Sequence, residues 1–138
     1  MRSRIILGII GSIFSLYSML WAADWKNVVK DRAGNQWLYD LTGITHPSEG
    51  IVRVWAKTIF SEKGKESLIK VRGRRFQDLS HCRTLRKYNC GEKKAITLAE
   101  IDYSKEGKVL DMDTFLTSDW SDVIPGTFEE LMLKATCK

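Results

Sequence analysis

The sequence predicts an α+β domain, an antiparallel β-sheet of about six strands with a C-terminal α-helix packed on it. Two observations lead to this prediction. From residue 25 onward, short apolar runs with the alternation of strands are separated by glycine-containing or charged turns, about every ten residues. Near the carboxyl end, Pro125 and Gly126 precede a segment whose apolar residues recur at helical spacing.

The chain begins with the pattern of a secretory signal peptide, which we assign to residues 1–22. Two arginines precede an uncharged run over residues 5–20, and the small residues Ala22 and Ala23 follow. Cleavage after Ala22 or Ala23 releases a domain over residues 23–138, so the chain meets the membrane only during export. The alternative is an uncleaved anchor, because the run is about long enough to span a bilayer.

The charge of the released domain is modest. The chain of 138 residues carries 22 basic and 17 acidic residues, a formal net charge of +5. Removal of Arg2 and Arg4 with the leader leaves 20 basic residues against 17 acidic ones, a charge of +3. An excess of this size at an exported location does not predict binding to nucleic acid.

The first half of the domain is predicted to form a β-meander. Its strands are expected at residues 25–30, 36–41 and 51–60, with a turn at 31–35 and a loop over 42–50. The second strand places Trp37, Tyr39 and Leu41 on one face. In the third strand one alternating face is apolar and is predicted to lie in the core, namely Val52, Val54, Ala56 and Phe60.

The second half is predicted to contain a short helix, two long strands and the C-terminal helix. The expected order is a helix at residues 65–75, strands at 80–90 and 93–103, a turn at 104–108 and a further strand from Val109. Thr127 and Glu130 have the spacing of a capping box. Behind them an apolar stripe is expected to face the sheet, namely Phe128, Leu131, Met132 and Ala135.

Three cysteines predict one disulfide and one free thiol in an oxidising compartment. Cys82 and Cys90 lie at the two ends of one predicted strand, too far apart to bond. A bond between Cys90 and Cys137 closes a loop of 47 residues, which favours this pair in the chain-entropy model. Cys82 is then a small buried apolar residue or an intermolecular partner.

Several segments carry a family resemblance in their order and spacing. They are VRVWAK at 52–57, DYSKEGKVL at 102–110, Trp120, IPGT at 124–127, Leu131 and Cys137, preceded by Trp25 and the pair Tyr39-Asp40. Together they resemble the bacterial surface-adhesin protein E family over nearly the whole domain.

The resemblance implies an antiparallel sheet of about six strands with a C-terminal helix, a homodimer, and a cysteine pair matching Cys90 and Cys137. Cys82 departs from the family pattern. The family's namesake is an exported adhesin that binds extracellular-matrix proteins such as vitronectin and laminin, and many members belong to environmental bacteria. No binding-residue motif carries over to positions of this chain.

Basic residues are densest between residues 70 and 94, where few acids interrupt them. The candidate ligand-binding residues there are Arg72, Arg74, Arg75, Arg83, Arg86 and Lys87. A glycosaminoglycan, an acidic protein, a lipopolysaccharide phosphate or extracellular nucleic acid would be attracted to them. The alternative is an ordinary solvated face.

Trp55 is a further candidate, because it shares a strand face with Arg53 and Lys57, opposite the valines. The alternative is a second small core under the C-terminal helix.

No catalytic residue, metal ligand or cofactor is predicted. His81 and Cys82 are strand neighbours that point to opposite faces, and only two histidines are present. We therefore predict an exported, non-enzymatic, adhesin-like binding protein of the periplasm, cell surface or extracellular space, which binds a protein or an anionic extracellular ligand. The alternative is a periplasmic assembly or inhibitory factor with one dedicated protein partner.

Overall fold

The computed structural model describes residues 22–115 and 119–138. The predicted signal peptide covers residues 1–22, so all of it except Ala22 lies outside the described residues, and it stays a prediction. Within the described ranges no helix is both long and apolar enough to cross a membrane.

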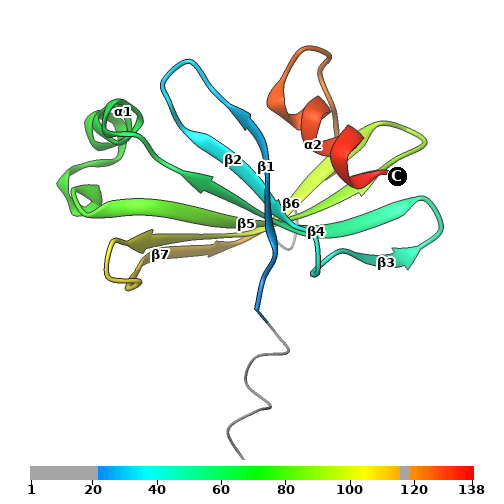
Figure 1. Ribbon diagram of the computed structural model, residues 1–138, viewed down its shortest axis with the longest axis horizontal. Coiled ribbons are helices and arrows are strands. Elements are labelled where there is room, and N and C mark those ends of the chain that lie inside the picture. The colour runs from blue at the N-terminus through cyan, green and yellow to red at the C-terminus, as the bar shows by residue number, and fades with distance from the viewer. Residues whose placement is uncertain (1–21, 116–118) are drawn as a thin grey trace, which may run out of the picture.

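One antiparallel sheet organises the described part of the chain (Figure 1). The strand order is β1-β2-β4-β5-β6-β7, and the short strands β3 and β8 pair with β4 and β6. The strands are β1 Trp25–Lys30, β2 Gln36–Asp40, β3 Thr45–Ser48, β4 Ile51–Ile59, β5 Leu79–Asn89, β6 Lys94–Ser104, β7 Val109–Thr114 and β8 Ser121–Asp122. The helices are α1 Glu62–Arg72 and α2 Phe128–Thr136, with a 3-10 turn at Arg74–Phe76. The predicted fold class is confirmed.

The core lies between α2 and one face of the sheet. Its fully buried members come from β4, β5 and α2, namely Val54, Ala56, Tyr88, Met132 and Leu133. Val52 is also buried, so the valine face of β4 is core as predicted, although Phe60 lies beyond the end of the strand and is only half-buried. We call this side of the sheet the covered face, and the opposite side the open face.

The predicted stripe on α2 is right for Met132, which is 1% exposed, and for Phe128, which stacks on Trp37, but it is wrong for Leu131. Leu131 is 42% exposed, whereas Leu133 is 7% exposed and packs against the sheet. The physical reason is the disulfide: Cys137 lies one turn after Leu133 on the same side of the helix, so the bond to the sheet turns that side inward. The capping box is also absent, because the Thr127 hydroxyl donates to the carbonyl of Ile124 instead.

The predicted disulfide is confirmed. Cys90, just beyond β5, is bonded to Cys137 at the end of α2, with an S–S distance of 2.09 Å and 5.7 Å between the Cα atoms. The bond therefore attaches the helix to the sheet across 47 residues of sequence. Cys82 is free and buried in β5.

Three local predictions need correction. Residues 45–48 form the edge strand β3. This strand tolerates Pro47, which has no backbone N–H, because an edge strand is hydrogen-bonded to a neighbour on one side only. α1 begins three residues earlier than expected, because Ser61 caps it by accepting a hydrogen bond from Gly64 N at 3.0 Å. Leu41 lies outside β2 and is exposed, while Trp37 and Tyr39 do share the covered face.

Candidate functional site

The open face carries like charges directly opposite one another. In the register of β4 and β5, Arg53 lies opposite Lys87 and Lys57 lies opposite Arg83. Trp55 and Leu85 form the rung between these two pairs. Like charges in directly opposed positions destabilise a sheet, so neither pair is explained by the stability of the fold. We call these four basic residues the cationic ladder.

The cationic ladder has no acidic partner among the described residues. None of its four side chains lies within ion-pair distance of a carboxylate there. Moreover, Arg83 Nε is buried and has no hydrogen-bond partner within the described part of the chain. A buried donor without an acceptor costs about 1–3 kcal/mol, a cost that a bound acceptor would remove.

Aromatic rings surround the inner pair of the ladder. Lys57 Nζ lies 5.3 Å from the centre of the Trp25 ring, and the Arg83 guanidinium lies 5.5 Å from the same ring and 5.3 Å from the Tyr103 ring. These cation–π contacts hold the two basic groups in place. A pocket of about 280 Å³ opens here, lined in part by Trp25, Trp55, Arg83 and Tyr103.

The one acid that lines this pocket in the described structure already accepts hydrogen bonds. Asp40 lines the same pocket, but its Oδ1 accepts hydrogen bonds from Asp24 N at 2.9 Å and from the Thr42 hydroxyl at 2.7 Å. The carboxylate therefore organises the start of β1 and the loop after β2, and no ion pair joins it to the cationic ladder in the described structure.

The basic groups perturb each other electrostatically. Burial lowers the pKa of Lys57, and the charge of Arg83 lowers it further. Burial also lowers the pKa of His81, which stacks on Tyr103 at 4.9 Å, and the charges of Lys57 and Arg83 lower it further. His81 is thus neutral at pH 7, and the charge of the open face comes from the ladder.

The residues predicted from the basic run do not form one patch. Trp55, Arg83 and Lys87 come together on the open face. Arg72 and Arg86 point to the covered face, where both meet carboxylates. Arg74 and Arg75 lie in the 3-10 turn, and both are exposed. Arg75 forms an ion pair with Asp111, with 3.1 Å between Nη2 and Oδ2, whereas Arg74 has no ion pair among the described residues.

Trp55 lies on the face opposite α2, so the alternative of a second core under that helix is wrong. Sequence reasoning missed Arg53 and Lys57 as site residues, together with Trp25 and Tyr103. The sequence does contain two segments in which basic residues alternate with other residues, Arg53-x-Trp55-x-Lys57 and Arg83-x-Leu85-x-Lys87. It does not show that these two segments lie side by side in the sheet. His81 and Cys82 lie on opposite faces as expected, so the histidine cannot act as a base for the thiol.

The covered face has the opposite charge along β6 and β7. Asp102 lies opposite Asp111, and Glu100 lies opposite Asp113. Arg72 of α1 partly compensates this charge, with its Nη1 at 3.7 Å from Glu100 and at 3.7 Å from Asp102. The covered face is therefore acidic along β6 and β7, whereas the open face is basic along β4 and β5.

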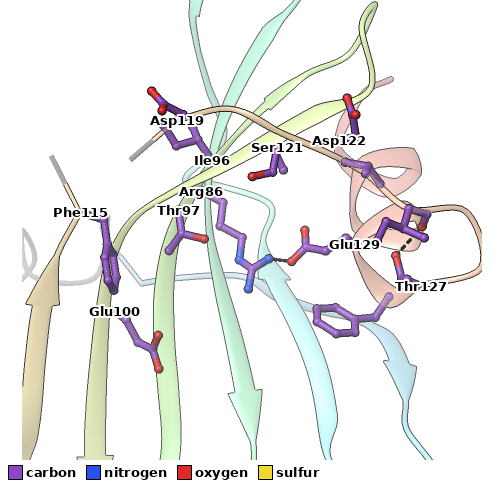
Figure 2. Close-up of a pocket in the computed structure, with 14 residues that line it drawn as sticks. Arg86, Ile96, Thr97, Glu100, Phe115, Asp119, Ser121, Asp122, Thr127 and Glu129 are labelled. Atoms are coloured by element: carbon purple, nitrogen blue, oxygen red, sulfur yellow. Dashed lines mark hydrogen bonds and ion pairs between the residues drawn. The ribbon is translucent and has the colours of Figure 1, made fainter. Parts of the chain in front are cut away.

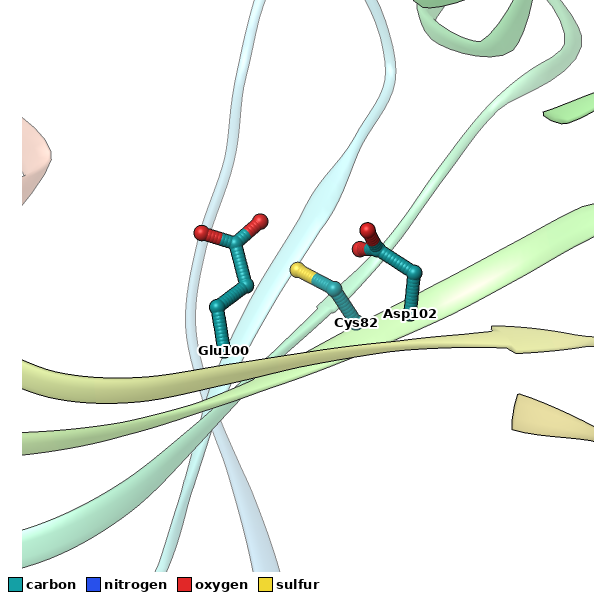
Figure 3. A group of neighbouring side chains, drawn as sticks. All are labelled: Cys82, Glu100 and Asp102. Carbon is teal, nitrogen blue, oxygen red and sulfur yellow. The ribbon is translucent and has the colours of Figure 1, made fainter. Parts of the chain in front are cut away.

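Figure 3 shows Cys82, Glu100 and Asp102 projecting from the same side of the sheet, and their ligand atoms lie within 4.8 Å of one another. Burial, and then the two carboxylates, raise the pKa of the Cys82 thiol to about 11, so the thiol is protonated at neutral pH. Burial, and then Glu100, raise the pKa of Asp102 to about 6. Arg72 already supplies positive charge to the two carboxylates, with its Nη1 at 3.7 Å from each.

A larger pocket, of about 510 Å³, lies on the covered face between α2 and the strands β6 and β8 (Figure 2). Arg86 extends into it and forms an ion pair with Glu129 of α2. Glu129 also accepts a hydrogen bond from the Tyr88 hydroxyl at 2.8 Å, and Arg86 Nε donates to the Thr84 hydroxyl at 3.1 Å. These contacts tie the start of α2 to the sheet.

Residues 25–138 match the family model described as surface-adhesin protein E. No curated protein matches the chain, and no solved structure does.

Proposed function

The chain belongs to the surface-adhesin protein E family, and from this premise we propose that it is an exported, non-enzymatic binding protein that holds an anionic group of its ligand against the open face. The ligand is a protein or another anionic molecule outside the cytoplasm. Trp55, Arg83 and Lys87 are the predicted residues to which we assign this role, together with Arg53 and Lys57.

One observation carries the proposal, namely the directly opposed pair Lys57–Arg83 with a buried and unpartnered Arg83 Nε. Both features cost free energy in the unbound protein, and both costs fall when a carboxylate, sulfate or phosphate group binds between the two side chains. Attraction of this kind weakens as salt rises, because exposed charges are screened.

The aromatic side chains support a binding role over a catalytic one. Trp25, Trp55 and Tyr103 present broad apolar area beside the charges, which is the composition of binding hot spots. Acid-base or nucleophilic catalysis needs a base within reach of a nucleophile, and His81 and Cys82 point away from each other.

Export and assembly complete the proposal. We assign residues 1–22 to a cleaved signal peptide and residues 23–138 to the exported domain, in the periplasm or at the cell surface. Ala23, the first residue after cleavage at the preferred position, lines the pocket beside Trp25 and Arg83. The new amino group would then add positive charge at this site. A homodimer is the assembly that the family resemblance implies.

The test compares two double variants that each remove two positive charges. Lys57→Gln with Arg83→Gln alters the ladder, whereas Lys63→Gln with Lys105→Gln alters exposed lysines elsewhere. Retention on heparin and capture of partners from an envelope extract are measured for both, after circular dichroism has shown that both are folded.

We expect the ladder variant to leave the heparin column at clearly lower salt and to lose about tenfold or more in affinity for the captured partner. The control should bind nearly as the unmodified protein does. Equal losses in the two variants would contradict the proposal, because they would reflect net charge alone. Fractionation adds a second check: protein confined to the periplasm would favour the dedicated periplasmic factor over an adhesin.

A further inference from the structure

The two basic pairs of the cationic ladder lie at a fixed spacing along the sheet. The inner pair is Lys57 and Arg83, and the outer pair is Arg53 and Lys87, with one uncharged rung between them. Four residues separate Arg53 from Lys57 along β4, which corresponds to about 13 Å at the rise of a strand. A ligand that contacts both pairs must therefore carry two anionic groups at about this separation.

The uncharged rung between the pairs disfavours a third anionic group. Its residues are Trp55, which is half-buried, and Leu85, which is only 8% exposed. Asp40 lines the same pocket as Trp55, so a carboxylate is already present beside this rung. An anionic group placed here would lose hydration against apolar area and would be repelled by Asp40. An apolar group would instead remove the Trp55 ring from water.

An extended polypeptide has the repeat that this surface requires. Its alternate side chains point to one face, so residues i, i+2 and i+4 cover about 13 Å on that face, the same span as the two basic pairs. A polyanion with charges along its whole length, such as a glycosaminoglycan or a nucleic acid, would place anionic groups over the uncharged rung as well. The spacing therefore favours a protein ligand over these polymers.

We infer that the open face binds an extended acidic segment of a partner protein, with acidic residues at positions i and i+4 and an apolar residue at i+2. This inference rests on the proposed function and specifies its ligand. One acidic side chain lies between Lys57 and Arg83, where it forms charge-assisted hydrogen bonds. The second lies between Arg53 and Lys87, and the apolar side chain covers Trp55.

Four short peptides with blocked termini test the inference on the unmodified exported domain. The spaced peptide is Glu-Thr-Val-Thr-Glu, and the adjacent peptide, of the same composition, is Val-Thr-Thr-Glu-Glu. The neutral peptide is Gln-Thr-Val-Thr-Gln, and the three-acid peptide is Glu-Thr-Glu-Thr-Glu. Threonine and valine favour the extended conformation. Dissociation constants are measured at physiological salt from the NMR shifts of backbone amides of the domain.

We expect the spaced peptide to give saturable shifts at Trp55 and Arg83. It should bind about two- to fivefold more tightly than the adjacent peptide, the range of one exposed charge pair, because adjacent acids in an extended chain point to opposite faces. The neutral peptide should bind most weakly. The three-acid peptide should bind more weakly than the spaced one in spite of its extra charge, because its central acid meets the uncharged rung.

A double variant shows whether the outer pair recognises the second acid. Arg53→Gln with Lys87→Gln removes the outer pair and leaves the inner pair unchanged, so the spaced and adjacent peptides should then bind equally. The matched control, Lys63→Gln with Lys105→Gln, alters exposed lysines elsewhere or beside no ladder residue and should keep the difference between the two peptides. Circular dichroism first shows that both variants are folded.

The outcomes separate this inference from the proposed function on which it rests. Equal binding of the spaced and adjacent peptides to the unmodified domain, or tightest binding of the three-acid peptide, would overturn the inference. The proposed function would still stand if heparin retention depended on the ladder. Failure of every acidic peptide to bind, together with heparin retention that is unchanged in the ladder variant, would overturn both.

Discussion

Replacement of Asp102 by asparagine should remove a pH-dependent loss of stability. The Asp102 side chain is only 6% exposed, and burial together with Glu100 raises its pKa from 3.8 to about 6, although Arg72 opposes the shift. A carboxyl whose pKa is raised on folding binds its proton more tightly in the folded state. Its contribution to stability is therefore fully present below pH 3.8 and is lost as the pH rises through about 6.

The magnitude follows from the size of the shift. A rise of about two units, at about 1.4 kcal/mol per unit, corresponds to about 3 kcal/mol between pH 4 and pH 8. An asparagine side chain at this position would be neutral at every pH and would not incur this loss. The free energy of unfolding of Asp102→Asn, taken relative to the unmodified protein, should therefore rise by about 3 kcal/mol over this range. Arg72 is 45% exposed, so the loss of its partner adds little.

Urea unfolding followed by circular dichroism at several pH values measures this difference. EDTA is included so that no bound cation holds the carboxylate ionised. Asp78→Asn, which alters an exposed carboxylate, is the control and should differ from the unmodified protein by less than about 0.5 kcal/mol throughout. A difference for Asp102→Asn that is independent of pH, or that falls as the pH rises, would refute the reasoning.

Three further measurements address the disulfide, the free thiol and the tryptophan of the open face. Replacing Cys90 and Cys137 by serine should lower the free energy of unfolding by about 4 kcal/mol, because the bond closes a loop of 47 residues, and a reductant should abolish the difference from the unmodified protein. Cys82 should not react with a maleimide at pH 8 until urea is added, since it is 6% exposed and its thiol pKa is about 11; rapid labelling of the folded protein would contradict this. Trp55→Ala should weaken ligand binding while the protein keeps the sedimentation coefficient of the unmodified chain; a smaller particle would instead place Trp55 at an interface between copies.

Much of the fold was predictable from local pattern. The strand β1 was predicted at its observed bounds, and β4, β5 and β6 were within a residue of theirs, because alternating apolar residues and turn-forming segments mark each strand. The disulfide was predictable for a similar reason, since the length of one strand ruled out the nearer pair. The orientation of α2 about its own axis was harder to predict, because Leu131 and Leu133 both fit a helical pattern. Contacts with the sheet decide which of them is buried, among them the disulfide between Cys137 and Cys90 and the ion pair between Glu129 and Arg86.

The candidate sites depend on register and on sidedness. The sequence by itself determined that basic residues gather between residues 70 and 94 and that Trp55 shares a face with Arg53 and Lys57. It did not determine that Arg83 pairs with Lys57 while Arg86 meets Glu129, because strand register depends on contacts between residues far apart in the chain. Only the tertiary structure shows that the basic residues of β5 lie on two faces of the sheet, Arg83 and Lys87 on the open face and Arg86 on the covered face. A difference of one position along a strand reverses the face, and here it separates an unpaired cation from a neutralised one.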